Sequence, residues 1–183
     1  MKTPKDQRNV WQTPIRSLIS PLLLLTLATF SGCTTYSSVQ VQEPLEPSKH
    51  YQVRIDGCVN RTDFQGSRDI AAESTRTLLK KIDDSGLFQI SPDANYALTC
   101  DIERFQEGSA FKRWLAPGYG VTQAEVVVMV WELPAQKVLA TFRSEAKVEA
   151  GGLYTIGAAE YILGVAFDDI IRQLKAWVSG ENY

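Results

Sequence analysis

The segment from Pro21 to Cys33 constrains the chain more than any other, because it determines where in the cell the rest of the chain is located. It ends an apolar run that extends from about Ile15 to Phe30. The cationic side chains at and before the start of this run are Lys2, Lys5, Arg8 and Arg16. A basic start followed by an apolar run is typical of an export signal. A lasting membrane span needs about 20 mostly apolar residues, and this run is shorter, so we predict that residues 1–32 are a cleaved signal peptide.

The last four residues of the segment, Phe30-Ser31-Gly32-Cys33, resemble the lipobox of bacterial lipoproteins. In that family the cysteine sulfur is diacylated, and cleavage then leaves the cysteine as the new N-terminus. Phe30 departs from the pattern, since Leu, Val or Ile is more frequent there. The resemblance implies that Cys33 is lipidated, and two or more acyl chains anchor a protein stably to a bilayer. The alternative is an ordinary signal peptide with an incidental cysteine.

The residue after the cysteine is Thr34. In Gram-negative lipoproteins, the lack of an aspartate at this position implies, by the same resemblance, sorting to the outer membrane. We therefore expect a protein that is anchored to the outer membrane through the acyl chains on Cys33 and that faces the periplasm.

Composition predicts one domain after the signal. Residues 33–183 suit a single domain in length. The chain has 19 Lys and Arg against 21 Asp and Glu, and four of these cations but one acid belong to the signal, which leaves a net charge of about −5. This balance argues against nucleic acid as a partner, because phosphate binding depends on clustered positive charge. Residues 33–49 are polar and contain two prolines, which predicts a flexible tether, or alternatively an ordered arm packed on the domain at 50–183.

Hydrophobic periodicity predicts the fold class. Apolar residues alternate with polar ones along four segments, which predicts strands near residues 51–59, 94–105, 121–133 and 138–149. Apolar residues at three- and four-residue spacing predict helices over residues 70–85 and 156–178, the first capped by Ser67 or Asp69 and ended by Gly86. The order β-α-β-β-β-α implies an α+β two-layer sandwich, with a four-stranded, mostly antiparallel sheet and both helices on one face.

Two cysteines remain for the exported domain, Cys58 and Cys100. They lie in strands that we expect to be neighbours, in an oxidising compartment that permits a disulfide. Simple alternation, however, places Cys58 on the polar face and Cys100 on the apolar face. A disulfide therefore requires a bulge near Gly57, and the alternative is two separately buried thiols.

Two surfaces are candidates for contact with a partner. The loop over residues 108–120 mixes cations and aromatics, and its candidate residues are Lys112, Arg113, Trp114 and Tyr119. Such a loop binds a partner or rests on lipid headgroups, unless Phe111, Trp114 and Leu115 pack under the sheet edge. A predicted apolar patch on the outer sheet face consists of Val127, Met129, Trp131 and Leu139. An exposed apolar patch marks an interaction site, although the tether or a second sheet would also cover it.

The sequence contains no recognisable catalytic set. His50 is the only histidine, so serine or cysteine nucleophiles lack an imidazole base, and a clustered metal-ligand set is missing as well. The acid pairs Asp83-Asp84 and Asp168-Asp169 are expected to solvate helices. We therefore expect no enzymatic activity and no cofactor.

The segment from about Ala97 to Trp177 resembles a family of small bacterial lipoproteins of unknown function. The shared features are a strand that ends in a Gly-Ser turn at Ile102–Ser109, the Gly-rich loop from Arg113 to Gly120, a hairpin over Glu125–Val148 and a closing helix after Gly152. The resemblance implies the fold and an envelope location, and it carries no assigned reaction.

These observations favour a membrane-anchored envelope lipoprotein that acts as a protein-interaction or assembly module, with an envelope protein or a second copy as its partner. The alternative is a carrier of a small ligand or lipid. A carrier requires a cavity between helix and sheet, which we expect to be lined by Phe142, Tyr154 and Phe167.

Overall fold

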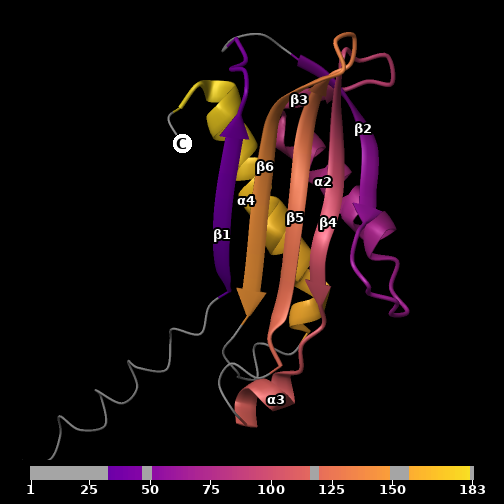
Figure 1. The fold of residues 1–183 in the computed structure, drawn as a ribbon, viewed down its shortest axis with the longest axis vertical. Helices are drawn as coiled ribbons and strands as arrows, with labels where there is room; N and C mark the ends of the chain where they lie inside the picture. Colours follow the sequence, from indigo (N-terminus) through magenta and orange to yellow (C-terminus); the bar gives the residue numbers. More distant parts are fainter. Residues whose placement is uncertain (1–32, 47–50, 116–119, 149–156, 182–183) are drawn as a thin grey trace, which may run out of the picture. The chain divides into compact units, whose positions relative to one another are not determined.

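A six-stranded sheet carries two long helices on one of its faces (Figure 1). The computed structural model describes residues 33–46, 51–115, 120–148 and 157–181. The strands are β1 (Thr34–Val41), β2 (Tyr51–Asn60), β3 (Phe88–Ile90), β4 (Tyr96–Gln106), β5 (Thr122–Glu132) and β6 (Lys137–Val148). The helices are α2 (Ile70–Ser85), the short α3 (Ala110–Leu115) and α4 (Ala158–Ser179).

The α+β class is confirmed, but the predicted number of four strands is wrong. The order in the sheet is β1-β6-β5-β4-β2-β3, so β1 and β3 add one strand at each edge. Strand β2 runs parallel to β3 and β4, and the other neighbours are antiparallel. Strand β3 was missed because three residues are too few to show a periodicity.

The first part of the predicted flexible tether is in fact ordered. Residues Thr34–Val41 form β1, which pairs with β6 from Thr34 opposite Lys147 to Val41 opposite Ala140. The chain then continues against the domain, where Leu45 is buried and the Trp177 indole donates a hydrogen bond to the carbonyl of Glu43. The ordered arm, our alternative to a tether, therefore describes residues 34–46, while residues 47–50 lie outside the described part.

Local signals explain the two long helices. The Asp69 side chain caps α2 by accepting a hydrogen bond from the Ala72 amide, and Gly86 ends the helix with a left-handed φ of 63°. Its buried face consists of Ile70, Ser74, Leu78 and Ile82. Helix α4 packs on β5 and β6. The spacing of its apolar residues places most of them on this packed face.

A bulge at Gly57 explains how Cys58 reaches the core. The register between β2 and β4 shifts between Ile55 and Cys58, and Gly57 has a φ of 89°, which favours glycine. After this shift, Cys58 lies opposite Cys100 on the buried face, and the two residues form a disulfide. The Cys58 amide donates to the Thr75 hydroxyl of α2, which ties the bulge to the helix layer.

The space between helices and sheet is filled with large side chains. Phe142 of β6 and Phe167 and Trp177 of α4 are fully buried, and the rings of Phe142 and Trp177 meet edge to face. Two of the three residues expected to line a carrier cavity are therefore core residues, and the third, Tyr154, lies outside the described part of the chain. In the described part of the chain, Phe142 and Phe167 therefore fill the core and do not line a cavity.

Candidate functional site

Strand β1 lies at an edge of the sheet and has no charged residue and no proline. Natural proteins protect edge strands by charges, prolines, bulges or short length, because an open edge pairs with other chains. All but one of the eight residues of β1 are exposed. Strand β1 is therefore an edge that the sequence leaves receptive to another strand.

The pairing with β6 determines which backbone groups of β1 point outward. The Gln42 amide donates to the carbonyl of Leu139, which continues the register of the β1 and β6 pair. Hydrogen-bonded pairs alternate in an antiparallel ladder, so the residues of β1 with even numbers bond to β6. The amides and carbonyls that point away from the sheet belong to Thr35, Ser37, Val39 and Val41.

A buried carboxylate fastens β1 to α4. Asp169 is 3% exposed, and it accepts hydrogen bonds from the Ser37 hydroxyl at 2.6 Å and from the Gln173 amide nitrogen at 2.8 Å. The Arg172 guanidinium pairs with the same carboxylate. Burying a carboxylate is costly unless it is paired and hydrogen-bonded. The three donors meet this requirement, and the Ser37 hydrogen bond holds β1 to the helix.

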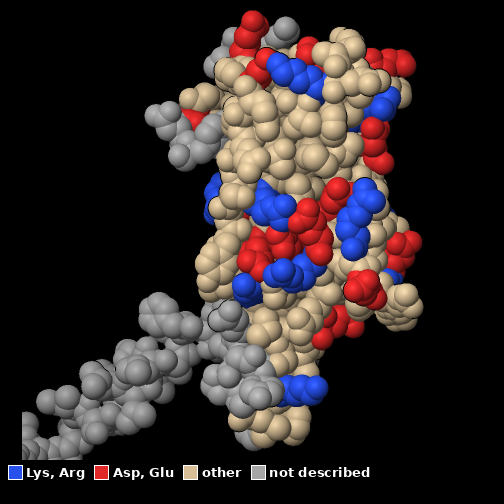
Figure 2. Space-filling model, viewed as in Figure 1, with Lys and Arg blue, Asp and Glu red and all other residues tan. Residues whose placement is uncertain are grey.

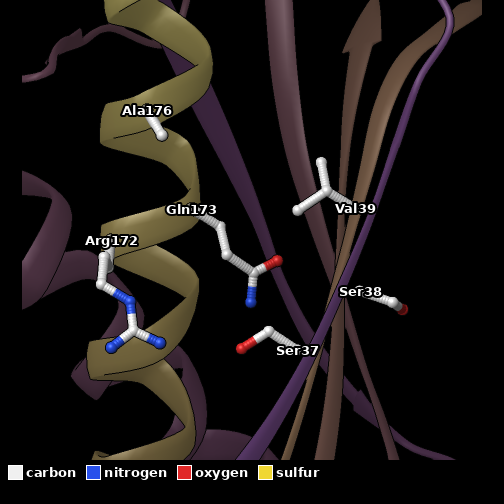
Figure 3. A pocket seen from close by; sticks show the side chains of 6 residues that line it. All are labelled: Ser37, Ser38, Val39, Arg172, Gln173 and Ala176. Atoms are coloured by element: carbon white, nitrogen blue, oxygen red, sulfur yellow. The ribbon is translucent and has the colours of Figure 1, made fainter. Parts of the chain in front are cut away.

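A groove opens between β1 and α4, with a volume of about 620 Å³. It is lined by Ser37, Ser38 and Val39 from the strand and by Arg172, Gln173 and Ala176 from the helix. Figure 3 shows Ser37 and Gln173 extending toward each other from the two walls. The groove therefore runs beside the outward backbone groups of β1.

Gln173 leaves one buried acceptor unused in this groove. The residue is 6% exposed, and its amide nitrogen donates to Asp169 and to the carbonyl of Arg143 at 3.1 Å. These two bonds fix the orientation of the amide, and its oxygen has no hydrogen-bond partner among the described residues. Buried polar atoms without a partner are uncommon, and this one belongs to a residue that lines the groove.

The outer face of the sheet carries a belt of six charged residues, which we call the charge belt (Figure 2). Its members are Glu103, Arg104, Glu125, Arg143, Glu145 and Lys147. The Arg143 guanidinium pairs with Glu103 and Glu125. The hydrogen bond with Glu103 is the main cause that raises the pKa of Arg143; burial opposes the rise and Glu125 adds to it. With three charges of each sign, the belt has no net charge that would select a partner.

The predicted apolar patch does not form on this face. Val127 is buried between its cross-strand neighbours Asp101 and Arg143. Leu139 is also buried and belongs to the main core, because the register between β5 and β6 shifts next to it. Met129 and Trp131 are half-buried, and the Trp131 indole donates to the Thr99 hydroxyl at 2.9 Å. A continuous exposed patch of the four residues was therefore a wrong prediction.

The predicted partner-binding loop contains the short helix α3. Lys112 is exposed on it, together with Phe111 and Leu115. The side chains of Arg113 and Trp114, and the whole of Tyr119, lie outside the described part. The alternative in which Phe111 and Leu115 pack under the sheet is wrong, since both are among the most exposed large hydrophobic residues.

Sequence reasoning missed the link between Asp169 and Gln173, because both acids of the Asp168-Asp169 pair were expected to face water. Only Asp168 does, where it pairs with Lys81. A signal was present: Asp169 follows the buried Ile162 by seven residues and precedes Gln173 by four, which places all three on one helix face.

The described residues include no group of three or more histidine, cysteine or acidic side chains placed to hold a metal ion. Among the helices of the same described ranges, none is long and apolar enough to cross a membrane.

Comparison with solved structures identifies the fold. A PelC dodecamer from Paraburkholderia phytofirmans matches with a TM-score of 0.51 and 13% identity, over 81% of this chain and 100% of that one. Protein XCC0632 from Xanthomonas campestris, of the DUF330 family, matches with a TM-score of 0.51 and 14% identity, over 77% and 94%. Such low identities show a shared fold alone. No protein-family model and no curated protein matches the chain.

Proposed function

We propose that this protein is a lipid-anchored, non-enzymatic protein of the bacterial envelope that binds other proteins, and that it receives an extended segment of its partner at β1. The observation that carries the proposal is the open edge of β1, which is eight residues long and has neither charge nor proline. Addition of a strand to an exposed sheet edge is a common mode of protein recognition.

The chemistry beside β1 fits a polypeptide. Four residues of the strand direct both a donor and an acceptor outward, and an added strand pairs with groups of this kind. The groove next to them is lined by Gln173, whose buried amide oxygen has no hydrogen-bond partner among the described residues and is a candidate acceptor for the incoming segment. Ser38 and Val39 offer a small polar and a small apolar contact for its side chains.

The anchoring part of the proposal rests on the lipobox-like Phe30–Cys33 and on the place of Cys33 next to β1. Strand β1 begins at Thr34, so no spacer separates the acylated residue from the sheet. By the lipoprotein sorting pattern at Thr34, the protein belongs at the outer membrane and faces the periplasm. Mass analysis of the N-terminal peptide tests this directly, since the proposal requires a diacylated cysteine at position 33 as the first residue.

Self-association is a second candidate for the role of β1. The PelC structure that shares this fold is described as a dodecamer, and two open β1 edges are able to pair with each other. In this case the segment that β1 receives belongs to another copy of the same chain.

A matched pair of crosslinking positions tests the proposal. Val41 of β1 is 37% exposed and Ile90 of β3 is 38% exposed, and they lie on opposite edges of the sheet. A photoreactive amino acid at Val41 is expected to capture one discrete protein in intact cells, or a second copy of the chain. The same label at Ile90 is expected to capture neither. Equal capture from both positions would contradict the proposal, and capture of lipid alone at Val41 would favour the carrier alternative.

A further inference from the structure

Cys33 and α3 lie at the same end of the sheet. Cys33 precedes Thr34, which pairs with Lys147, and the next residue of β6, Val148, pairs with Thr122 at the start of β5. The Gly108 amide, at the base of α3, donates to the Thr122 hydroxyl at 3.2 Å. Neighbouring strands are about 4.8 Å apart, so the start of β5 is roughly 10 Å from the start of β1 across the sheet. We call this end of the sheet the anchored end.

Helix α3 is held in place at its base. The Ser109 amide donates to the carbonyl of Gly120 at 3.0 Å, and the Ser109 hydroxyl accepts from the Lys112 amide at 3.3 Å. Gly120 has a φ of 68°, and a Cβ at this position would lie 2.7 Å from both the Ser109 carbonyl oxygen and the Lys112 Cβ. A side chain does not fit there, so Gly120 packs closely against the first turn of α3.

Exposed apolar side chains gather at the anchored end. Phe111 and Leu115 are 66% and 62% exposed, and their spacing of four residues places them on one side of α3. Tyr36 is three residues from Cys33 and is exposed. Tyr161 is exposed in the first turn of α4. These four are among seven exposed large hydrophobic residues in the described part of the chain.

The first turn of α4 also belongs to the anchored end. The Arg68 guanidinium donates to the carbonyl of Ala159 and pairs with Glu107, which follows the end of β4. At the opposite end of the sheet, Glu43 pairs with Lys137, and Glu46 and Asp93 are exposed. The two ends thus differ in degree. Four exposed large hydrophobic residues lie at the anchored end, beside the charged Arg68, Glu107 and Lys112, whereas two, Val41 and Ile90, lie at the opposite end.

We propose that the anchored end is a second, non-covalent membrane contact, in which Phe111 and Leu115 of α3 enter the interface of a phospholipid bilayer. This inference rests on the proposed acylation of Cys33. Without a spacer, the acyl chains hold this end against the bilayer, where exposed Phe and Leu side chains gain by leaving water. Tyrosines such as Tyr36 and Tyr161 suit the headgroup region, and Lys112 lies beside anionic headgroups, which attract it. The contact fixes the orientation of β1, so that its open edge extends away from the membrane.

A fluorescent label on a single new cysteine tests the contact. In the acylated protein, Cys33 is blocked and Cys58 is bonded to Cys100, so Leu115→Cys provides one reactive thiol. The control is Ile90→Cys, at the opposite end. The acylated full-length variants are reconstituted into vesicles of phosphatidylcholine and phosphatidylglycerol, with and without bromine on the lipid acyl chains.

We expect the label at residue 115 to shift its emission to shorter wavelength and to be quenched by the brominated lipid. The label at residue 90 should show neither effect. Equal responses at the two positions in protein whose Cys33 is acylated would overturn this inference and leave the anchoring intact. A non-acylated Cys33 would contradict the anchoring and, with it, the inference.

Discussion

The two edge strands of the sheet, β1 and β3, differ in how well they are protected against pairing with another chain. Strand β3 has three residues and is followed at once by Ser91 and Pro92, so it offers little to an incoming strand. Strand β1 has eight residues and none of the usual protective features. Within one sheet, the edge strand β3 is short and the edge strand β1 is long and unprotected, and this contrast supports the proposed addition of a strand at β1.

The edges also differ in how they are fastened. On the β3 side, the disulfide between Cys58 and Cys100 joins β2 to β4 covalently. On the β1 side, the strand is held by its ladder with β6 and by the hydrogen bonds around Asp169. Among the described residues, β1 is thus held by directional polar contacts with β6 and α4, where β2 and β4 have a covalent link.

Loss of the disulfide should give the largest change in stability. The double variant Cys58→Ala and Cys100→Ala removes a crosslink that closes a separation of 42 residues. The chain-entropy model gives a loss of up to about 4 kcal/mol in the free energy of unfolding. Both proteins carry Cys33→Ala, so that neither is acylated. Urea unfolding of this protein with and without the double substitution measures the loss. An unchanged unfolding midpoint would show that the β3 side does not depend on the crosslink.

Removing the carboxylate that holds β1 should have the next largest effect. Asp169→Ala leaves the Ser37 and Gln173 donors without their acceptor, at a cost of about 3 kcal/mol. The neighbouring Asp168→Ala is the matched control, since its carboxylate is 70% exposed and its ion pair is worth less than about 1 kcal/mol. The same urea experiment compares the two, and equal losses would refute the special role of Asp169.

Removing one donor should loosen β1 with a smaller cost. Ser37→Ala deletes the hydroxyl that donates to Asp169, for about 1.5 kcal/mol. Hydrogen exchange should become faster at the amides of β1, while those of β2 and β4 stay unchanged. Ser38→Ala changes an exposed neighbour and should alter stability by less than about 0.5 kcal/mol. If both variants exchange alike, the hydroxyl does not fasten the strand.

Much of the fold was predictable because its elements bury an apolar face. Strands β2, β4, β5 and β6 show the alternation of a half-buried strand, and α2 and α4 show helical spacing. The edge strands β1 and β3 were not predicted, and for β1 the reason is physical. Strand β1 is almost wholly exposed and polar, and it forms because its backbone completes the ladder of β6. A hydrophobic pattern does not report a contact of this kind.

The candidate site was less predictable than the fold. The patch at Val127 and Leu139 was expected to be exposed, but the register shift in β6 and the charge belt bury these residues. The disulfide required a bulge that glycine at position 57 made visible in the sequence. The link from Ser37 to Asp169 joins residues 132 positions apart, and a single sequence gives no signal for such a pairing.

The most direct test of the account blocks the outward edge of β1 and changes little else. Thr35→Pro removes an amide that points away from the sheet, at an exposed edge position where proline is tolerated, so the free energy of unfolding should change by less than about 1 kcal/mol. Thr35→Val keeps the amide and is the control. With the photoreactive label at Val41, we predict that capture of the partner is lost in the proline variant and kept in the valine variant. Undiminished capture by a folded proline variant would contradict strand addition at β1.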